Sequence, residues 1–492
     1  MNAKAKAKSA LAGWPAVSLA VFTAAWGGNE FTPLLVMYRT ASNMSAVVVD
    51  VLLFLYVLGI VPALLIGGPM SDRFGRRALM LPSPVIAAIG SMLLAAGEHS
   101  VPLLAAGRIL SGIALGLAMA VGGTWIKELS DRAGDSPSAG ARRAALSLTA
   151  GFGVGAGLAA VLAQWAPLPG QLSYLVNIAL AVVSLALIWT TPETRQRSTE
   201  GRLIDAMKIP SARRARFWLV VGPVAPWVFG ACAMSYAVIP AMMTERTPGT
   251  AIAFAGLCCV AGLTAGFFIQ TLGKKIDRPG SVRALLAALG LVAVGMALAI
   301  VLVLSPSLPL AVVAAVVLGG GYGMALISCL LEVQRIAGPR DLAGLTAVFY
   351  TLTYLGFASP AVMSWVSETF PSIGYPEMFG FGIAFGSSAL GGQYAPSRIP
   401  ALPLIGVVTV GKALIVGVIV AVIGAILVKR GRTRWACLVE VKTGGDTQTD
   451  EQVSTYLNLA RDHGIDAVMT VSNEIAAEPG TSPLTFTRAQ LK

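Results

Sequence analysis

Long apolar runs recur along this chain, and each is close to the length that a helix needs to cross a bilayer, about 20 residues. Short polar stretches separate the runs. The chain is 55% hydrophobic and only 12% charged, and its mean hydropathy is +0.74. A soluble protein carries about 25% charged residues. The composition therefore excludes a soluble globular protein and predicts an all-α polytopic membrane protein.

The length criterion predicts twelve transmembrane helices in two six-helix bundles, joined by a basic linker at residues 191–216. In the first bundle (1–190) we expect helices at 12–38, 47–66, 79–97, 101–126, 143–165 and 171–190. In the second bundle (217–430) we expect helices at 217–243, 250–272, 282–304, 308–332, 342–367 and 404–428. Residues 371–403 are rich in Gly and Pro, and we expect them to form an irregular outer segment.

Positive charges indicate how the chain crosses the membrane, because Lys and Arg collect in cytoplasmic loops. With the N-terminus inside, the inner loops and linker hold about 23 Lys and Arg residues, against about three in the outer loops: Arg39, Arg246 and Arg398. We therefore expect a multi-pass protein of the plasma membrane, with both ends of its membrane region in the cytoplasm. The basic N-terminus precedes a run too long for a signal peptide, so an uncleaved first helix is expected.

One polar stretch, GGPMSDRFGRR (67–77), lies between the second and third apolar runs. Its order of residues resembles the loop between helices 2 and 3 of major facilitator superfamily (MFS) transporters. The resemblance implies the MFS fold, alternating access, and a cytoplasmic gating cluster that stabilises the outward-facing state. The residues assigned to this cluster are Gly68, Asp72, Arg73, Gly75, Arg76 and Arg77, with Glu128 at the inner end of helix 4.

Three ionisable residues fall inside predicted spans, where charge is costly and is a functional candidate by default. Glu30 follows a Gly-Gly-Asn break in helix 1, Arg108 lies in helix 4, and Asp50 opens helix 2. Glu30 and Arg108 are both about 10–12 Å below the outer surface, so we expect them to face one cavity and to pair. Proton exchange at Glu30, with Arg108 holding its charge, is one hypothesis; a static structural pair is the other.

Glycines in helices 4 and 5 form a second set of candidates. Arg108 and the glycines after it resemble the MFS helix 4 motif, in which an intramembrane Arg is linked to proton coupling. The helix 5 glycines resemble the motif of proton antiporters, although Ala156 stands where that motif has Pro. Glycines also permit close helix packing, which is an equally good reading. The five positions are Gly112, Gly116, Gly151, Gly153 and Gly155.

After Arg434 the composition changes, and residues 435–492 predict a cytoplasmic α/β tail with two strands around an amphipathic helix. Glu440-Val441-Lys442 on the first strand resembles part of a PD-(D/E)xK nuclease-like module. Such a site needs a further acid on a neighbouring strand to bind Mg²⁺, and a membrane helix is expected upstream instead. We therefore do not expect an active nuclease, nor any other enzyme.

Other features narrow the expected partners. Four of the five cysteines lie in apolar runs without His or carboxylates at ligand spacing, so we expect packing roles and neither a metal nor a cofactor. The net charge of +12 lies in short loops, which topology explains without nucleic acid. The expected partners are a small-molecule substrate, protons and the lipid bilayer, and the chain is expected to be a monomer.

The leading interpretation is a secondary active transporter that exports small, partly apolar solutes in exchange for protons. Pro192-Glu193-Thr194 after helix 6 resembles sugar-porter-like members of the MFS. With the missing Gly-Pro in helix 5, it leaves open proton symport of a sugar or an organic acid. A third reading is a membrane-anchored protein whose function lies in the tail. The sequence has no G-x-x-x-x-G-K-[ST] loop, which disfavours an ATP-driven pump.

Overall fold

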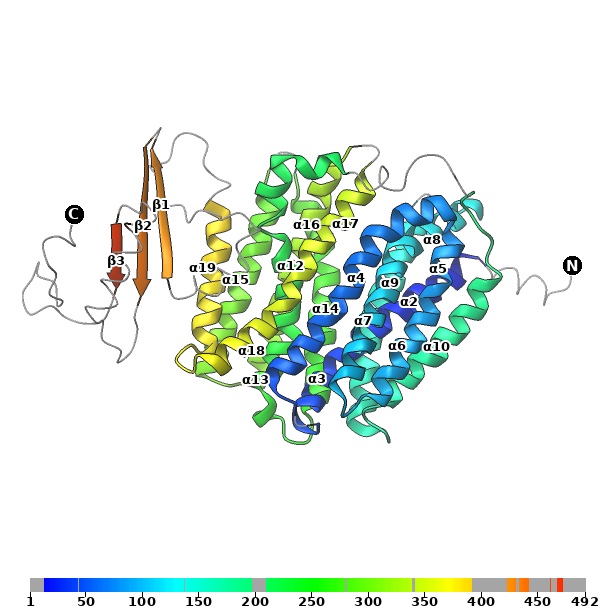
Figure 1. The fold of residues 1–492 in the computed structure, drawn as a ribbon, viewed down its shortest axis with the longest axis horizontal. Helices are drawn as coiled ribbons and strands as arrows, with labels where there is room; N and C mark the ends of the chain where they lie inside the picture. Colours follow the sequence, from blue (N-terminus) through cyan, green and yellow to red (C-terminus); the bar gives the residue numbers. More distant parts are fainter. Residues whose placement is uncertain are drawn as a thin grey trace, which may run out of the picture. The chain divides into compact units, whose positions relative to one another are not determined.

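The structure is a computed structural model that describes residues 13–42, 44–136, 138–196, 209–278, 281–338, 341–391, 423–430, 433–441, 461 and 467–471. Its contacts divide the chain into two units, Met1–Ser387 and Ser388–Lys492. Within the described residues, the first unit is built entirely from helices (Figure 1).

The first bundle contains six rods, because several helical segments join end to end. Its segments are α2 (Trp14–Asn29), α3 (Phe31–Thr40), α4 (Ala46–Phe74), α5 (Arg76–Met80), α6 (Pro82–Ala96), α7 (Val101–Leu117), the π-helical turn η1 (Ala118–Gly122), α8 (Gly123–Arg132), α9 (Ala139–Trp165) and α10 (Leu172–Trp189). The six rods are α2–α3, α4, α5–α6, α7–η1–α8, α9 and α10.

The second bundle follows two short segments of the linker region. Its segments are η2 (Pro210–Arg213), η3 (Phe217–Val221), α12 (Ala225–Ala233), η4 (Met234–Val238), α13 (Ile239–Met242), η5 (Thr244–Arg246), α14 (Ala251–Ile276), α15 (Arg283–Leu304), α16 (Leu308–Ile336), α17 (Leu342–Tyr354), η6 (Leu355–Ala358), α18 (Ser359–Thr369) and α19 (Tyr375–Gly391). Here the rods are η3–α13, α14, α15, α16, α17–α18 and α19.

In the part of the chain that is described, ten helices are long and apolar enough to cross a membrane. The broken rod α2–α3 and the 17-residue helix α19 bring the number of rods to twelve. The predicted all-α polytopic fold with two six-helix bundles is thereby confirmed. Eleven rods lie within a few residues of their predicted positions, apart from longer ends at α4 and α8.

Two predictions near the end of the second bundle, the irregular segment 371–403 and the helix 404–428, are wrong in the parts that the structure describes. The chain forms α19 over 375–391, where an irregular segment was expected, and residues 423–428 belong to a strand instead of a helix. Pro376 lies in the first turn of α19, where a missing N–H costs nothing. Glycines in the body of a helix are tolerated in lipid because no water competes for the backbone. Residues 392–403 and 404–422, with Arg398, lie outside the described residues, as do 1–12, 197–208 and Lys442.

The stretch 67–77 is also more regular than the expected polar turn. Helix α4 continues through it to Phe74, and the helix breaks only at Gly75. The Ser71 hydroxyl donates to the Gly68 carbonyl, and Asp72 pairs with Arg76 one turn later. These local contacts carry the helix past the end of the apolar run, which is why its hydropathy alone placed the boundary too early.

The two bundles meet along a seam. We call the end of the rods near Arg76 and Asp341 the linker end, and the opposite end, near Arg39 and Gly249, the far end. Hydrogen bonds between the bundles join Asn29 to Cys259, Gln164 to Gly249 and Ala253, Ser364 to Asp50, and Tyr354 to Met119. These contacts lie in the middle or at the far end, and no ion pair between described residues crosses the seam.

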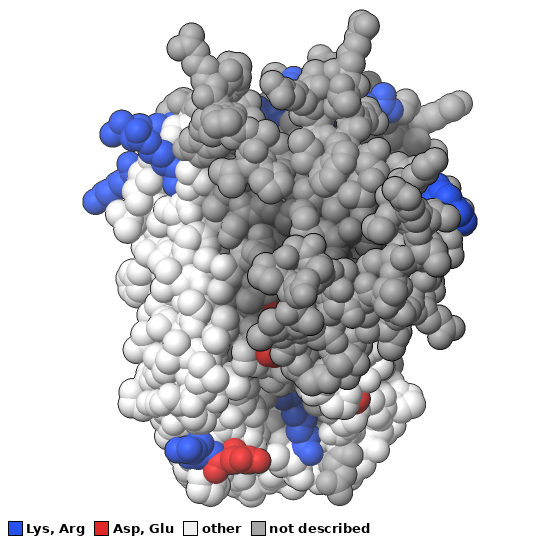
Figure 2. Space-filling model, turned by 90° about the vertical axis from the view of Figure 1, so that its left-hand side faces the viewer, with Lys and Arg blue, Asp and Glu red and all other residues white. Residues whose placement is uncertain are grey.

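Charge is unevenly distributed over the helical unit. Figure 2 shows Lys and Arg side chains at the upper, linker end, a charged group at the lower end, and a broad uncharged flank between them on the left of the view. Apolar side chains such as Phe268, Leu304 and Leu219 are 65–76% exposed on such flanks. An uncharged belt with exposed apolar side chains suits contact with lipid.

The second unit contains three described strands, β1 (Ile423–Arg430), β2 (Thr433–Val441) and β3 (Ala467–Val471), in the order β1-β2-β3. β1 pairs antiparallel with β2, and β2 pairs parallel with β3. The two strands predicted in the tail are confirmed. Of the predicted helix between them only Arg461 is described, and it is helical.

Candidate functional site

The break in the first rod positions Glu30, the single residue between α2 and α3. The backbone N–H of Glu30 still bonds the Trp26 carbonyl, so the rod continues with only a local interruption. Pro33 explains the interruption, because it has no N–H to donate to the carbonyl of Asn29. The break therefore follows from the sequence Asn-Glu-Phe-Thr-Pro as much as from the glycines before it.

Glu30 is fully buried inside the first bundle. One carboxylate oxygen accepts from Trp26 Nε1 and from the Ser173 hydroxyl, both at 2.9 Å. The other lies 3.4 Å from the Ser91 hydroxyl, whose proton goes to the nearer Asn177 amide oxygen at 3.0 Å. The site is thus built by α2, α6 and α10, and two neutral donors, Trp26 and Ser173, serve one carboxylate oxygen.

Arg108 is also fully buried, in α7. Its guanidinium donates to the backbone carbonyls of Leu52, Leu53 and Gly28 at 3.2–3.3 Å. The guanidinium also lies over the rings of Phe31 and Tyr56, 4.7 and 4.4 Å from their centroids. Carbonyl dipoles and aromatic faces therefore hold this charge in the bundle.

The three ionisable candidates lie in two places. Glu30 and Arg108 both contact the break in the first rod, since Arg108 bonds Gly28 two residues from Glu30, but the described contacts include no ion pair between them. Asp50 lies elsewhere, at the far end of the seam. It pairs with Arg39 at 2.5 Å and accepts from the Ser364 hydroxyl of the second bundle.

An aromatic cluster closes the middle of the seam. Tyr56 of the first bundle meets Tyr354 and Phe357 edge-on, with centroids 6.0 and 5.3 Å apart. Phe229 stacks on Phe357 and on Tyr322. The cluster connects the aromatic cage of Arg108 to the second bundle, and it separates the far end of the seam from the linker end.

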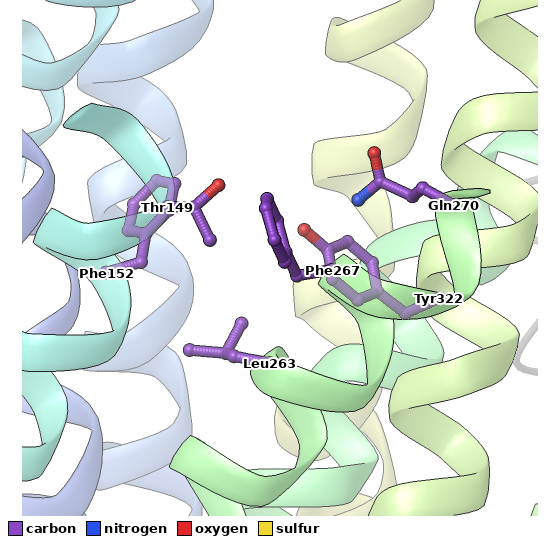
Figure 3. Close-up of a pocket in the computed structure, with 6 residues that line it drawn as sticks. All are labelled: Thr149, Phe152, Leu263, Phe267, Gln270 and Tyr322. Atoms are coloured by element: carbon purple, nitrogen blue, oxygen red, sulfur yellow. The ribbon is translucent and has the colours of Figure 1, made fainter. Parts of the chain in front are cut away.

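A small pocket lies between the bundles on the linker-end side of this cluster, with a cavity volume of about 20 Å³, room for about one water molecule. Its lining residues are half-buried and come from α9, α14 and α16: Thr149, Phe152, Leu263, Phe267, Gln270 and Tyr322. Figure 3 shows Thr149 and Phe152 facing Phe267 and Tyr322 across the open space. The lining is aromatic with three polar groups and carries no charge.

Sequence reasoning missed the residues of this pocket. Aromatic residues of the apolar runs are natural candidates to line an apolar cavity, but none of the following lines this pocket: Trp26, Phe31, Trp227, Phe229, Tyr236, Tyr350 and Tyr354. Gln270 carried a usable signal, since it is a polar side chain inside the apolar helix α14. The hydroxyls of Thr149 and Tyr322 have no hydrogen-bond partner among the described residues, so they are available to a solute.

The residues predicted to form a gating cluster lie at the linker end, within the first bundle. Arg76 pairs with Asp72 at 2.8 Å and with Glu128 at 3.0 Å. Glu193 accepts from the backbone N–H groups of Arg76 and Arg77, at the start of α5. The carboxylate of Glu193 thereby stabilises the positive end of that helix.

The remaining cluster residues lie around this centre. Gly75 has φ +101°, and a Cβ there would lie 2.5 Å from Glu193, so only Gly suits the position. Gly68 accepts from Ser71, Arg77 donates to the Trp189 carbonyl, and Arg73 lies 5.8 Å from the ring of Phe74.

The candidate glycines pack unequally. A Cβ on Gly112 would lie 1.9 Å from the Tyr56 carbonyl oxygen of α4. A Cβ on Gly116 would lie 2.7 Å from the Ile60 carbonyl oxygen of the same helix. Gly151 and Gly155 lie against α2, whereas Gly153 faces open space. Glycine thus allows α7 to approach α4, and α9 to approach α2, at backbone distance.

No group of three or more His, Cys, Asp or Glu side chains that could hold a metal ion occurs among the described residues. Cys232, Cys258, Cys259 and Cys329 are buried free thiols. Their burial among helices is that of packing side chains.

Solved structures share this fold at low sequence identity. The xylose transporter XylE from E. coli, in a partially occluded inward open conformation, gives a TM-score of 0.56 at 17% identity, over 80% of this chain and 99% of that one. A POT family transporter in complex with 5-aminolevulinic acid gives 0.60 at 13% identity, over 77% and 93%. At such identities the similarity shows the fold alone.

Similarity in sequence is confined to part of the chain. A triacylglyceride transporter of Mycolicibacterium smegmatis is 30% identical over 152 residues, 31% of this chain and 26% of that protein. The bacillibactin exporter of Bacillus subtilis is 27% identical over 143 residues, 28% of this chain and 36% of that protein. The matches thus span about a quarter to a third of these relatives. The family model of the Major Facilitator Superfamily matches residues 17–361, and the chain belongs to this superfamily of membrane transporters.

Proposed function

We propose that this transporter exports small, uncharged, partly apolar solutes in exchange for protons. The observation that carries the proposal is the pocket between α9, α14 and α16, which lies on the linker-end side of a seam closed by aromatic rings. Phe152, Phe267 and Tyr322 offer ring faces, and Thr149 and Gln270 offer hydrogen bonds. A solute that enters from the linker end meets this wall before the closed part of the seam.

Proton coupling is assigned to Glu30. A carboxyl group that is fully buried, with neutral donors and no directly paired cation, can change its charge without breaking an ion pair. It lies at a break in a rod that contacts both bundles, where a change of charge can alter the seam. The exporter named among the relatives supports export, and the sugar-porter-like Pro192-Glu193-Thr194 keeps symport as the alternative.

Transport by the purified protein in proteoliposomes tests the proposal. Uncharged aromatic solutes are expected to move against an imposed proton gradient, and Glu30→Gln is expected to abolish the effect of the gradient while solute exchange continues. Glu245→Gln, an exposed carboxylate at the far end, is the matched control. Movement of solute in the same direction as protons would instead establish symport. Transport of organic acids alone would contradict the uncharged pocket.

The proposed orientation places the linker end in the cytoplasm of the cell and the protein in its plasma membrane. Thr250 at the far end and Arg195 at the linker end are both exposed. A membrane-impermeant maleimide added to intact cells is expected to label Thr250→Cys and to leave Arg195→Cys unlabelled until the cells are opened. The reverse pattern would overturn the orientation.

The proposed transport path lies in the membrane region and does not use the tail. Deleting 423–492 removes all three described strands, and transport is expected to survive in the remaining membrane region. Loss of function with intact membrane insertion would favour the reading in which the tail carries the activity.

A further inference from the structure

Three consecutive residues at the break of the first rod face three different partners. The carbonyl of Gly28 accepts from Arg108 at 3.3 Å, and the carboxylate of Glu30 contacts polar groups of α2, α6 and α10. Between them, the Asn29 amide donates to the Phe152 carbonyl at 3.0 Å and lies 3.7 Å from the Cys259 sulfur. Only Asn29 of these three reaches the second bundle.

The partners of Asn29 belong to the walls of the pocket. Phe152 on α9 lines the pocket directly, and Cys259 lies one helical turn before Leu263 of α14, another lining residue. The Thr32 hydroxyl donates to the amide oxygen of Asn29 at 3.0 Å. Since Phe152 contributes only a carbonyl acceptor, the amide orientation is determined at both of its ends.

We propose that Asn29 is the positioning residue that transmits the charge state of Glu30 to the spacing of α9 and α14 at the pocket. The inference rests on the proposed proton role of Glu30. The two residues share one peptide unit, so a movement of the Glu30 backbone turns the Asn29 side chain. Because that side chain bonds α9 and contacts α14, the movement changes how these helices approach each other.

The surroundings of Glu30 give the direction of the effect. The Ser91 hydroxyl has one proton and donates it to the Asn177 amide oxygen at 3.0 Å, so the Ser91 oxygen can accept from a protonated Glu30 at 3.4 Å. The described arrangement, with two donors on one carboxylate oxygen and an acceptor beside the other, therefore suits the protonated form. The titratable or charged groups that face Glu30 are Arg108 from α7, Tyr38 from α3 and Tyr174 from α10; α6 contributes only Ser91. Raising the pH is therefore expected to disfavour the described arrangement, in which the pocket opens toward the linker end.

A thiol reporter in the pocket tests this without a known substrate. Gln270→Cys is labelled with N-ethylmaleimide in proteoliposomes, and the label at residue 270 is measured by mass spectrometry. At each pH, the labelling rate is divided by that of free N-acetylcysteine, which corrects for the pH dependence of the thiol reaction itself. From pH 6 to pH 8 this ratio is expected to fall at least about 3-fold, the factor for a shift of about 0.65 kcal/mol. In Asn29→Leu and in Glu30→Gln the ratio is expected to stay flat.

Gln164→Met is the matched control, because the Gln164 amide also joins the first bundle to α14 but lies far from the break. It is expected to keep the pH response. If Asn29→Leu shows the same pH dependence of labelling as the Gln270→Cys variant without a second substitution, this inference is overturned. The proposed proton role of Glu30 would remain intact. A labelling ratio that stays flat with pH in Gln164→Met would overturn the inference too. It would show that loss of any amide contact between the bundles removes the pH response.

A further variant covers the case in which Asn29→Leu does not fold. Thr32→Val releases the amide oxygen of Asn29 and is expected to reduce the response at least about twofold, about 0.4 kcal/mol; an unchanged response would contradict the proposal. If the reporter alone shows no pH response, or Glu30→Gln retains it, the proposed proton role of Glu30 fails and the inference fails with it.

Discussion

The guanidinium of Arg108 carries a permanent charge inside the first bundle without a carboxylate beside it. Three carbonyl oxygens accept its hydrogen bonds, and two aromatic rings flank it. The fork of N–H groups allows Arg to reach α4 and the break of the first rod at once. A lysine ammonium has a single centre and cannot span these acceptors.

Arg108→Lys is therefore expected to destabilise the protein. Leaving two buried carbonyls without a charged donor costs on the order of 2–4 kcal/mol, which should lower the melting temperature in detergent by several degrees. Arg142→Lys, at an exposed position, is the control and should melt like the parent. An unchanged melting temperature in Arg108→Lys would show that the carbonyl contacts contribute little.

Asp341 anchors the end of the linker to the start of α17. Its carboxylate accepts from the backbone N–H groups of Ser211 at 2.8 Å and Gly338 at 2.7 Å. Burial opposes ionisation of Asp341, but the hydrogen bonds from Ser211 and Gly338 outweigh it and hold the pKa of the carboxyl below its usual value. The anchor is thus strongest when the group is ionised.

Stability from this anchor should depend on pH in one direction. It is fully present above the unfolded pKa of about 3.9, and it is lost as the pH falls through the lower folded pKa. Asp341→Asn is expected to cost about 1.5 kcal/mol at pH 7, and the gap in melting temperature should close below about pH 4. Exposed Asp131→Asn is the control; a gap that persists at pH 3 would contradict the assignment.

Sequence reasoning found the buried charges but not their partners. Glu30 and Arg108 stand out because charge is rare in apolar runs, and their equal depth suggested a pair. Helical periodicity gives depth, but it does not give the rotation of one rod about its axis relative to another. Rotation decided the outcome: Glu30 faces α6 and α10, while Arg108 faces α4 and its aromatic cage.

At the scale of elements, hydropathy predicted rods well because lipid requires long apolar helices with every backbone group paired. Hydropathy misplaced elements where contact with lipid is not the only factor that decides the structure. Outside the lipid, α4 continues through polar residues to Phe74. At the end of the second bundle, α19 keeps its glycines, and the apolar run after 422 forms strand β1 instead. Composition could not separate these cases, because helix and strand both accept short apolar runs.

Two glycines make a matched pair for testing helix packing. Gly112→Ala places a methyl group about 1.9 Å from a carbonyl of α4, so α7 and α4 must separate at a cost of about 1–3 kcal/mol. Gly153→Ala meets open space and should be neutral or stabilise by about 0.5–1 kcal/mol. Melting temperatures of both variants in detergent check this, and equal shifts would exclude a special role for the α4–α7 contact.

At the scale of the whole molecule, the seam is closed at one end by few polar contacts. Asp50 is held by Arg39 within the first bundle and by Ser364 from the second. Both ion-pair clusters at the linker end stay within their own bundles. A rocking motion that opened the far end would therefore have to break the Asp50–Ser364 contact, whereas the clusters Arg76–Glu128 and Arg216–Glu332 would move as parts of their own bundles.

Ser364→Ala is expected to weaken closure at the far end. Loss of a hydrogen bond to a carboxylate, about 1.5–3 kcal/mol, should shift the protein away from the arrangement described here. Labelling of Gln270→Cys from the linker end should then slow at least about 3-fold. In Ser359→Ala, whose hydroxyl donates to the Gly356 carbonyl of its own bundle, the labelling rate should not change. Equal rates in both variants would show that the contact does not hold the seam.

The uncharged wall of the pocket has an energetic consequence for the proposed exchange. A neutral solute carries no charge outward, so each proton that enters in return moves one net positive charge across the bilayer. Membrane voltage then contributes about 2.3 kcal/mol per 100 mV to each turnover, comparable with the roughly 1.4 kcal/mol from each unit of pH difference. Such a carrier is electrogenic, and it can keep expelling its solute in cells whose medium has the same acidity as their interior.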